Sequence, residues 1–239
     1  MYKRQIKDRS ELINEISGID FDILISNGCK YILPTEKLKN KVLVNIHPST
    51  LPDLRGRNPI NANILFNKKP GATCHLMEDK IDAGKIISQK SIDLTEDLDL
   101  DLIYHLCFRL EKEVFEEALR LNFVGQYEQK DSKSTYYTRK EQDLKINFEQ
   151  SAKNIVKQIK AFSTKTQGAF FNFNNKIFRV FDAEIIVNPY IIEVAKKCKN
   201  YEIIFVYSNS IILKTSNEVI KFKNISGDIN SLVAGNIPV

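Results

Sequence analysis

The feature that most constrains the fold of this 239-residue chain is a short apolar run, residues 42–44, that leads into Asn45-Ile46-His47-Pro48. Such a run predicts a buried β-strand, and the proline ends it because proline cannot continue the ladder of backbone hydrogen bonds. Residues two apart on a strand project from the same face, so Asn45 and His47 are expected to point together. An amide beside an imidazole suits acyl-type chemistry, because the amide can hold a developing oxyanion and the imidazole can move a proton.

Asp82 is the second polar residue that indicates a site, and it follows Asn45 by 37 positions. Residues 72–77 and 85–92 predict two further strands, paired as a hairpin with Asp82 in the turn. The three polar side chains would then meet where open α/β sheets place their sites, at strand ends. Asp82 is expected to hold His47 charged or correctly oriented, or to position a water that shuttles a proton. The alternative is that Asp82 is only a turn residue.

The spacing of these residues resembles the family of formyltransferases that use 10-formyltetrahydrofolate. The family pattern is Asn-x-His-x-Ser-x-Leu-Pro, followed further along the chain by an Asp-x-Gly turn. It is matched here by Asn45, His47, Ser49, Leu51, Pro52, Asp82 and Gly84. Each piece alone would be weak, but the combination is specific. The resemblance runs from about residue 22 to residue 121 and continues more loosely into the C-terminal part.

Within the family, residues 25–34, 60–66 and 71–75 are most similar to the nucleotide-sugar N-formyltransferases. The resemblance implies 10-formyltetrahydrofolate as the formyl donor and a nucleotide-linked amino sugar, such as a dTDP-sugar, as the acceptor in polysaccharide or O-antigen biosynthesis. Residues 55–60 depart from the sequence that is usual in methionyl-tRNA formyltransferases. That enzyme is therefore the alternative, and an inactive remnant of the family is a third hypothesis.

The resemblance also assigns roles to residues of this chain. It implies that Asn45 is the oxyanion donor and that His47 and Asp82 manage protons. The cofactor-binding candidates in the folate pocket are Asn27, Gly28, Tyr31, Ile32 and Leu33. The alternative for these five residues is a glycine-bearing turn after a buried strand. The substrate-binding candidates are His75, Arg55 and Arg57. An arginine can hold a phosphate or carboxylate through two hydrogen bonds, although exposed loop arginines are usually only solvated. His75 is equally consistent with a structural histidine.

The predicted fold class is α/β. Residues 1–130 are expected to form a Rossmann-like formyltransferase sheet that is incomplete at the N-terminus. Residues 131–239 are expected to form a smaller, β-rich α+β domain after a polar linker at 131–137. Strands at 22–26 and 41–47 are apolar enough to be buried on both faces. Because the resemblance implies a further βαβ unit before residue 22, the strand at 22–26 is also expected to expose an apolar edge and to weaken the chain.

Patterning predicts the remaining elements. Helices are expected at 10–19, with Ser10 as the N-cap, and at 58–66, 98–121 and 148–162. The long helix has an apolar stripe that includes Leu102 and Leu106. A hairpin is expected at 170–187 around Asn174-Asn175, followed by three short strands in 201–225.

Bulk composition limits the partners. The cysteines are widely spaced, which favours free thiols in a reducing cytoplasm over disulfides or zinc: Cys29, Cys74, Cys107 and Cys198. No metal site is expected, because no two histidines have ligand spacing. Residues 1–130 hold 19 basic and 20 acidic side chains (net −1), and residues 131–239 hold 16 and 10 (net +6). Those lysines are scattered, so a solubilising surface is favoured over a surface that binds a nucleotide diphosphate or RNA. No run is long enough to span a membrane, and a homodimer is expected.

Overall fold

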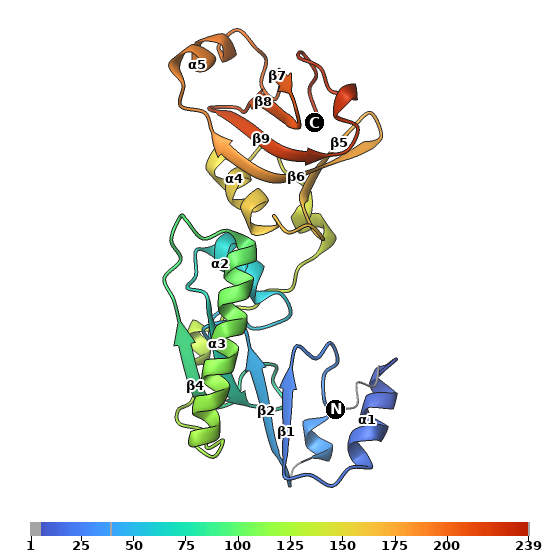
Figure 1. Cartoon of the computed structure of the whole chain (residues 1–239), viewed down its shortest axis with the longest axis vertical. Helices are drawn as coiled ribbons and strands as arrows, with labels where there is room; N and C mark the ends of the chain where they lie inside the picture. The colour runs from blue at the N-terminus through green and yellow to red at the C-terminus, as the bar shows by residue number, and fades with distance from the viewer. Residues whose placement is uncertain (1–5, 39, 239) are drawn as a thin grey trace. The chain divides into compact units, whose positions relative to one another are not determined.

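The computed structural model describes residues 6–38 and 40–238, and the chain divides into two compact units (Figure 1). The first unit contains the residues up to 60 together with 69–93 and 105–137. The second unit contains residues 61–68, 94–104 and 138–239. The first unit thus reaches past residue 130, into the segment that the sequence suggests is a linker.

A four-stranded mixed sheet forms the centre of the first unit. Its strands, in spatial order, are β1 (Ile23–Asn27), β2 (Val42–His47), β3 (Gly71–Leu76) and β4 (Ile86–Ser91). β1 runs parallel to β2, whereas β2–β3 and β3–β4 are antiparallel pairs. Asn45 is the cross-strand partner of His75. The predicted α/β fold is confirmed.

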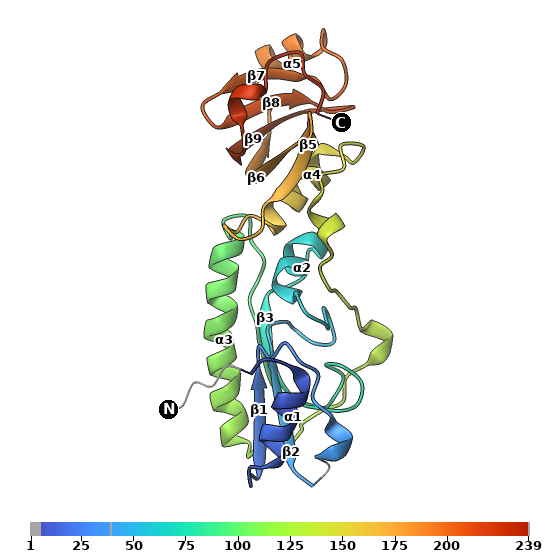
Figure 2. The same ribbon diagram turned by 90° about the vertical axis from the view of Figure 1, so that its right-hand side faces the viewer.

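One face of this sheet packs against α3 (Leu100–Arg120) (Figure 2). The apolar cluster between them contains Val44, Ile46, Ala72, Cys74, Ile87, Leu110, Val114, Ala118 and Phe123. The long helix was correctly predicted, but its buried stripe begins with Leu100, Ile103 and Cys107 and does not include Leu102, which is 42% exposed. Because strand residues alternate between faces, Asn45 and His47 lie on the opposite face of the sheet.

β1 does not meet the expectation of burial on both faces. Ile23 and Ile25 are 39% and 40% exposed, because β1 pairs only with β2 among the residues that the structure describes. The preceding helix α1 (Arg9–Ser17) buries none of its side chains. The prediction of Ser10 as its N-cap was wrong: the Asp8 carboxylate accepts the hydrogen bond from the Glu11 amide. An aspartate is as good a cap as a serine, and it starts the helix earlier.

The second unit is built on a five-stranded antiparallel sheet in the order β5-β6-β9-β8-β7. Its elements are α2 (Pro59–Phe66), α4 (Ala152–Ala161), β5 (Ala169–Phe173), β6 (Lys176–Ile185), α5 (Pro189–Ala195), β7 (Ile203–Tyr207), β8 (Ser210–Lys214) and β9 (Val219–Ser226). Asn174 and Asn175 have φ angles of 47° and 60°, as the two-residue hairpin turn requires. This turn and the three later strands agree with the predictions.

Two helical predictions in the second unit need correction. The helix expected at 148–162 starts only at Ala152, because the Ser151 hydroxyl caps it and Phe148 instead joins the apolar core. The short helix α5 was missed, although Asn188 caps it and Pro189 occupies its first position. Both residues are typical of a helix start.

Candidate active site

The polar face of β2 and β3 carries the candidate site. Asn45 and His47 project from β2, and His75 projects from the paired position on β3. Asp82 lies in the β3–β4 connection with φ of +52°. His47 and His75 are 5% and 1% exposed, so both imidazoles are buried.

The three catalytic candidates meet within contact distance. Asn45 Nδ2 donates to Asp82 Oδ1 at 3.3 Å and lies 3.2 Å from His75 Nε2. His47 Nδ1 lies 3.6 Å from Asp82 Oδ2, and His75 Nε2 lies 3.6 Å from Asp82 Oδ1. Distances of 3.6 Å are ion-pair separations rather than hydrogen bonds. The two imidazoles and the amide therefore surround one carboxylate.

Backbone carbonyls determine where each imidazole carries its proton. His47 Nε2 lies 2.9 Å from the Leu54 oxygen, and His75 Nδ1 lies 2.7 Å from the Leu76 oxygen. A carbonyl oxygen only accepts, so those two nitrogens must be N–H groups. In the neutral rings, His47 Nδ1 and His75 Nε2 are then unprotonated, and these are the two nitrogens that face Asp82. A proton that enters the site can therefore be received beside the carboxylate.

The electrostatics favour a charged aspartate and a neutral His47. Burial opposes ionisation of Asp82, but the neighbouring imidazoles of His75 and His47 and the Gly56 amide together lower its pKa to about 2. Burial lowers the pKa of His47 below 6.5, and this outweighs attraction to Asp82 and the bond to Leu54. Near pH 7 the site thus holds a carboxylate beside a basic imidazole. Of the two predicted states of His47, this supports the oriented neutral ring.

The loop after β2 supplies backbone groups to the site. The Gly56 N–H donates to Asp82 Oδ2 at 2.9 Å, and Leu54 holds His47 from a left-handed conformation with φ of 58°. Thr73, on the same face of β3 as His75, accepts from the Leu51 N–H and donates to the Ser49 oxygen. The loop is therefore fixed to β3 by hydrogen bonds at buried groups.

The two candidate arginines differ in burial. Arg55 is fully buried, and its guanidinium bonds to Gln129, Asp131 and Tyr136 inside the first unit. Its charge is thus directed inward rather than toward a ligand. Arg57 is exposed and donates to the Lys30 oxygen at 3.2 Å, which places it beside the loop after β1.

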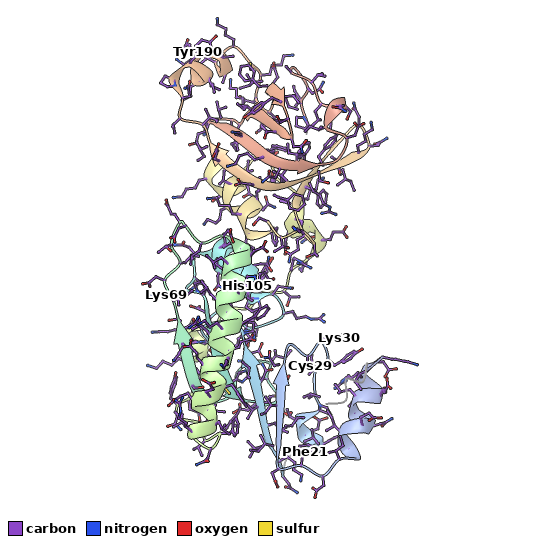
Figure 3. The ribbon with its side chains drawn as sticks, in the orientation of Figure 1. Phe21, Cys29, Lys30, Lys69, His105 and Tyr190 are labelled. Atoms are coloured by element: carbon purple, nitrogen blue, oxygen red, sulfur yellow. The ribbon has the colours of Figure 1, made fainter. Side chains whose placement is uncertain are left out.

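The folate-pocket candidates lie on that loop, which begins at the end of β1 next to β2. Gly28 adopts a φ of 63°, Ile32 is 61% exposed, and Leu33 is partly buried. The Tyr31 hydroxyl donates to the Lys7 oxygen at 2.7 Å. Figure 3 labels Cys29 and Lys30 on the same loop. The segment is accessible over most of its length.

Asn27 has a partner that the sequence did not reveal. Its Nδ2 donates at 3.2 Å to Oε2 of Glu111, which is only 7% exposed on α3. Burial raises the pKa of Glu111, and the bond from Asn27 partly offsets this. The two residues are 84 positions apart, so no local pattern could have paired them.

A cavity of about 790 Å³ lies along the start of β2 and the end of β3, and Asn45, His47, His75 and Asp82 are not among its lining residues. Part of its wall comes from Leu43 and Leu76, each close along its strand to Asn45 or His75, and part from Glu78–Lys80, which leads to Asp82. Its lining residues are Thr35, Leu38, Lys41, Val42, Leu43, Leu76, Met77, Glu78, Asp79, Lys80, Phe123, Val124 and Gly125. The volume falls within the range of small-molecule sites.

Other sequence-based expectations can be compared with the described residues. The four cysteines are free thiols. Among residues 6–38 and 40–238, no three or more histidine, cysteine or acidic side chains gather as a metal site would require. Within the same residues, no helix combines the length and apolar character needed to cross a membrane.

The sequence comparisons identify the family to which a chain with this fold and this site belongs. Residues 1–119 match the family described as Formyl transferase, and residues 139–231 match its C-terminal domain. The chain belongs to the formyl transferase family.

Curated relatives of the chain include methionyl-tRNA formyltransferases. Those of Rickettsia africae and Rickettsia prowazekii are each 29% identical, over 181 and 189 residues. The alignments cover 74% and 77% of this chain but only 59% and 62% of the relatives. The chain thus spans about three fifths of the length of these relatives.

Solved structures share the fold at lower identity. WlaRD, a sugar 3N-formyltransferase, has a TM-score of 0.63 at 22% identity and covers 84% of this chain and 72% of its own. The N-formyltransferase of Helicobacter canadensis, solved with folinic acid and dTDP-3-aminofucose, has a TM-score of 0.61 at 22% identity, covering 81% and 70%. HypX from Aquifex aeolicus has a TM-score of 0.69 at 18% identity, covering 92% and 40%.

Proposed function

We propose that this chain transfers the formyl group of 10-formyltetrahydrofolate to the amine of a nucleotide-linked amino sugar, with dTDP as the nucleotide. The observation that carries the proposal is the convergence of Asn45, His47 and Asp82, with the amide 3.3 Å from the carboxylate and the imidazole 3.6 Å from it. Family membership supports formyl transfer as the reaction.

The first step is attack of the uncharged acceptor amine on the formyl carbon, which turns the formyl oxygen into an oxyanion. Asn45 carries two N–H groups, directed at Asp82 Oδ1 and His75 Nε2, and a formyl oxygen bound beside the amide would share the second. A donor aimed at a developing oxyanion is worth roughly 3–4 kcal/mol of barrier. Asn45 is therefore the proposed oxyanion donor.

The second requirement is removal of a proton from the attacking amine, because nitrogen becomes positively charged in the tetrahedral intermediate. The ionised Asp82 accepts this proton, or relays it to Nδ1 of His47, which is unprotonated in the tautomer that Leu54 fixes. The proton then returns to the departing folate nitrogen as the carbon–nitrogen bond breaks. No net proton is consumed on the enzyme during a turnover.

The formyl donor would bind beside the Asp82 turn. The cavity along β2 and β3 has the volume for the pterin end of a folate, and the accessible 27–33 loop leaves the sheet at the strand next to β2. We propose that Asn27, Gly28, Tyr31, Ile32 and Leu33 contribute to this binding. The donor supplies the activated formyl group, and the chain supplies its orientation.

The amino-sugar acceptor is supported by the solved sugar N-formyltransferases with the same fold, one of them solved with a dTDP-amino sugar. A second candidate acceptor, methionyl-tRNA, is favoured by the curated sequence relatives. We rank the sugar first because residues 55–60 depart from the wording usual in the tRNA enzymes. His75 and Arg57 remain candidate substrate contacts. A homodimer in the cytoplasm remains a prediction.

A competition assay tests this ranking. The chain would be mixed with 10-formyltetrahydrofolate, dTDP-3-aminofucose and initiator methionyl-tRNA, and both formylated products would be quantified. We expect formylation of the sugar and none of the tRNA. Preferential formylation of the tRNA would promote the second candidate, and release of tetrahydrofolate with neither amine would reject transfer to both.

A further inference from the structure

We propose that the buried Arg55 and the half-buried Gln129 form a brace that positions His47 and Asp82 for proton transfer. The two residues lie 74 positions apart and come from the loop after β2 and from the connection that follows α3. Neither would contact substrate, so both are positioning residues. The kinetic part of this inference rests on the proposed function, whereas its structural part does not.

Arg55 is fixed by bonds on three sides. Its Nε and Nη2 donate to Gln129 Oε1 at 3.2 and 2.7 Å, and its Nη1 donates to Asp131 Oδ1 and to the Tyr136 hydroxyl, both at 2.9 Å. The guanidinium carbon also lies 5.6 Å from the centre of the Tyr136 ring. A fully buried guanidinium is costly unless it is paired and hydrogen-bonded, so these partners hold the side chain in one place.

The place of Arg55 in the chain gives this anchoring its consequence. The residue before it, Leu54, provides the carbonyl that accepts from His47 Nε2, and the residue after it, Gly56, provides the N–H that donates to Asp82 Oδ2. Moving Arg55 would move both backbone contacts. One anchored side chain therefore controls the tautomer of the imidazole and the position of the carboxylate together.

Gln129 carries the brace to the turn that holds Asp82. While its Oε1 accepts from Arg55, its Nε2 donates to the backbone carbonyl oxygens of Asp82 at 2.9 Å and of Gly84 at 2.8 Å. A neutral amide is needed at this point, because it combines an acceptor for the guanidinium with two donors for carbonyls. The turn tolerates little adjustment: a Cβ on Gly84 would lie 2.0 Å from the Leu76 oxygen.

The backbone completes the connection. The Arg55 N–H donates to the Thr135 oxygen at 2.9 Å, and the Tyr137 N–H donates to the Arg55 oxygen at 2.8 Å. The segment that the sequence suggests is a polar linker thus pairs with the site loop as a strand would. The brace joins the catalytic loop, the aspartate turn and this segment.

The decisive experiment compares Gln129→Glu with the neighbouring Glu128→Gln. Gln129→Glu keeps an acceptor for Arg55 but replaces two N–H donors with oxygens that repel the Asp82 and Gly84 carbonyls. Glu128 has a 69% exposed side chain paired with Lys85, so the reverse substitution there is a matched control. Arg55→Lys, which keeps the charge but loses the fork of donors, is the second variant in case Gln129→Glu does not fold.

Two measurements are made on each variant. The first is kcat and KM for formyl transfer to dTDP-3-aminofucose. The second is nitrogen-15 NMR of the imidazoles, which reports the tautomer and pKa of each ring, and the chain has only three histidines to assign. In the wild type His47 should be the Nε2–H tautomer with a pKa below 6.5. A merely stabilising role for Gln129 would shift the melting temperature and leave the folded-state tautomer unchanged.

We expect Gln129→Glu to lower kcat by a factor on the order of 10², as misplacement of about 1 Å can do, with little change in KM. The His47 tautomer should become mixed, because the Leu54 carbonyl no longer selects the Nε2–H form, while Glu128→Gln behaves as the wild type. Wild-type kcat, or a lower kcat with an unchanged His47 spectrum, would overturn the brace. If the wild type transfers no formyl group, the proposed function fails and the NMR comparison alone decides the brace.

Discussion

The sheet of the second unit has an apolar core, whereas the sheet of the first unit has one apolar and one polar face. The sheet of the second unit is filled by aromatic and aliphatic groups, with Phe148, Phe171, Phe178 and Phe222 in ring contact. The sheet of the first unit buries apolar groups against α3, but its other face presents the polar side chains of Asn45, His47, Thr73 and His75. Apolar cores need volume and close packing, whereas a buried polar face needs a partner for each donor and acceptor.

This difference separates stability from function. In the second unit, a lost ring leaves a cavity and lowers the free energy of unfolding. In the first unit, Asp82 and its partners satisfy one another, and removing one leaves others unpaired at the place where charge is expected to develop. The comparison predicts that substitutions in the second sheet change mainly stability and that those on the polar face change mainly rate.

The largest effect on stability is expected from Phe222→Ala. This ring is fully buried, and its centre lies 6.2 Å from Phe171 and 6.3 Å from Phe148. Its removal should lower the free energy of unfolding by about 3–5 kcal/mol, because the surrounding rings can refill the cavity only partly. Urea unfolding followed by circular dichroism measures the loss. Phe205→Ala, at a 40% exposed ring of the same sheet, should lose far less. Equal losses would contradict the comparison.

The next largest effect is expected on the rate. Asn45→Ala or Asp82→Ala should lower kcat by a factor on the order of 10²–10³, because an oxyanion donor or a proton-handling group is lost. Single-turnover formyl transfer measures the change. Asp93→Asn, which removes an exposed carboxylate paired with Lys69, should keep wild-type activity. If both site variants stayed within a few-fold of the wild type, the assignment of the polar face would be wrong.

Local sequence patterns predicted the elements of this fold that depend on neighbouring residues. The strands, hairpins and long helix follow from apolar periodicity, and Asn174-Asn175 marks its turn because few residues tolerate positive φ at both positions. Helix starts were placed less well, since Asp8 and Ser10 are both good caps and the sequence pattern gives no reason to prefer one of them.

The candidate site was predicted where residues lie close in sequence or match a spacing. Asn45, His47 and Asp82 converge as expected, but the contact of His75 with Asn45 depends on strand register. Register could have been inferred from the hairpin only after the strand order was known. No local sequence pattern indicates the role of Gln129. The role follows from contacts with Asp82, Gly84 and Arg55, and each of these lies more than 40 positions from Gln129 in the sequence.

A third prediction concerns pH and tests whether Asp82 also stabilises the fold. The pKa of Asp82 is about 2 in the folded chain, against the ordinary value of 3.8, so its contribution is fully present above about pH 4 and is lost as pH falls through 2. A shift of this size corresponds to about 2 kcal/mol. The difference in unfolding free energy between the wild type and Asp82→Asn should therefore shrink from pH 5 to pH 2. A constant difference over this range would show that Asp82 is not held as an ion.

The smallest effect is expected at the surface of the second unit, from Ser151→Ala. The Ser151 hydroxyl accepts from the Asn154 N–H at 3.3 Å and caps α4, and loss of such a cap costs about 1 kcal/mol. Urea unfolding should show this loss, and kcat should not change, because the bond of the Ser151 hydroxyl lies within the start of α4. Ser151→Asp keeps an acceptor at the cap and should restore wild-type stability. Lower kcat in Ser151→Ala at a temperature where it is fully folded would break the separation between the two sheets.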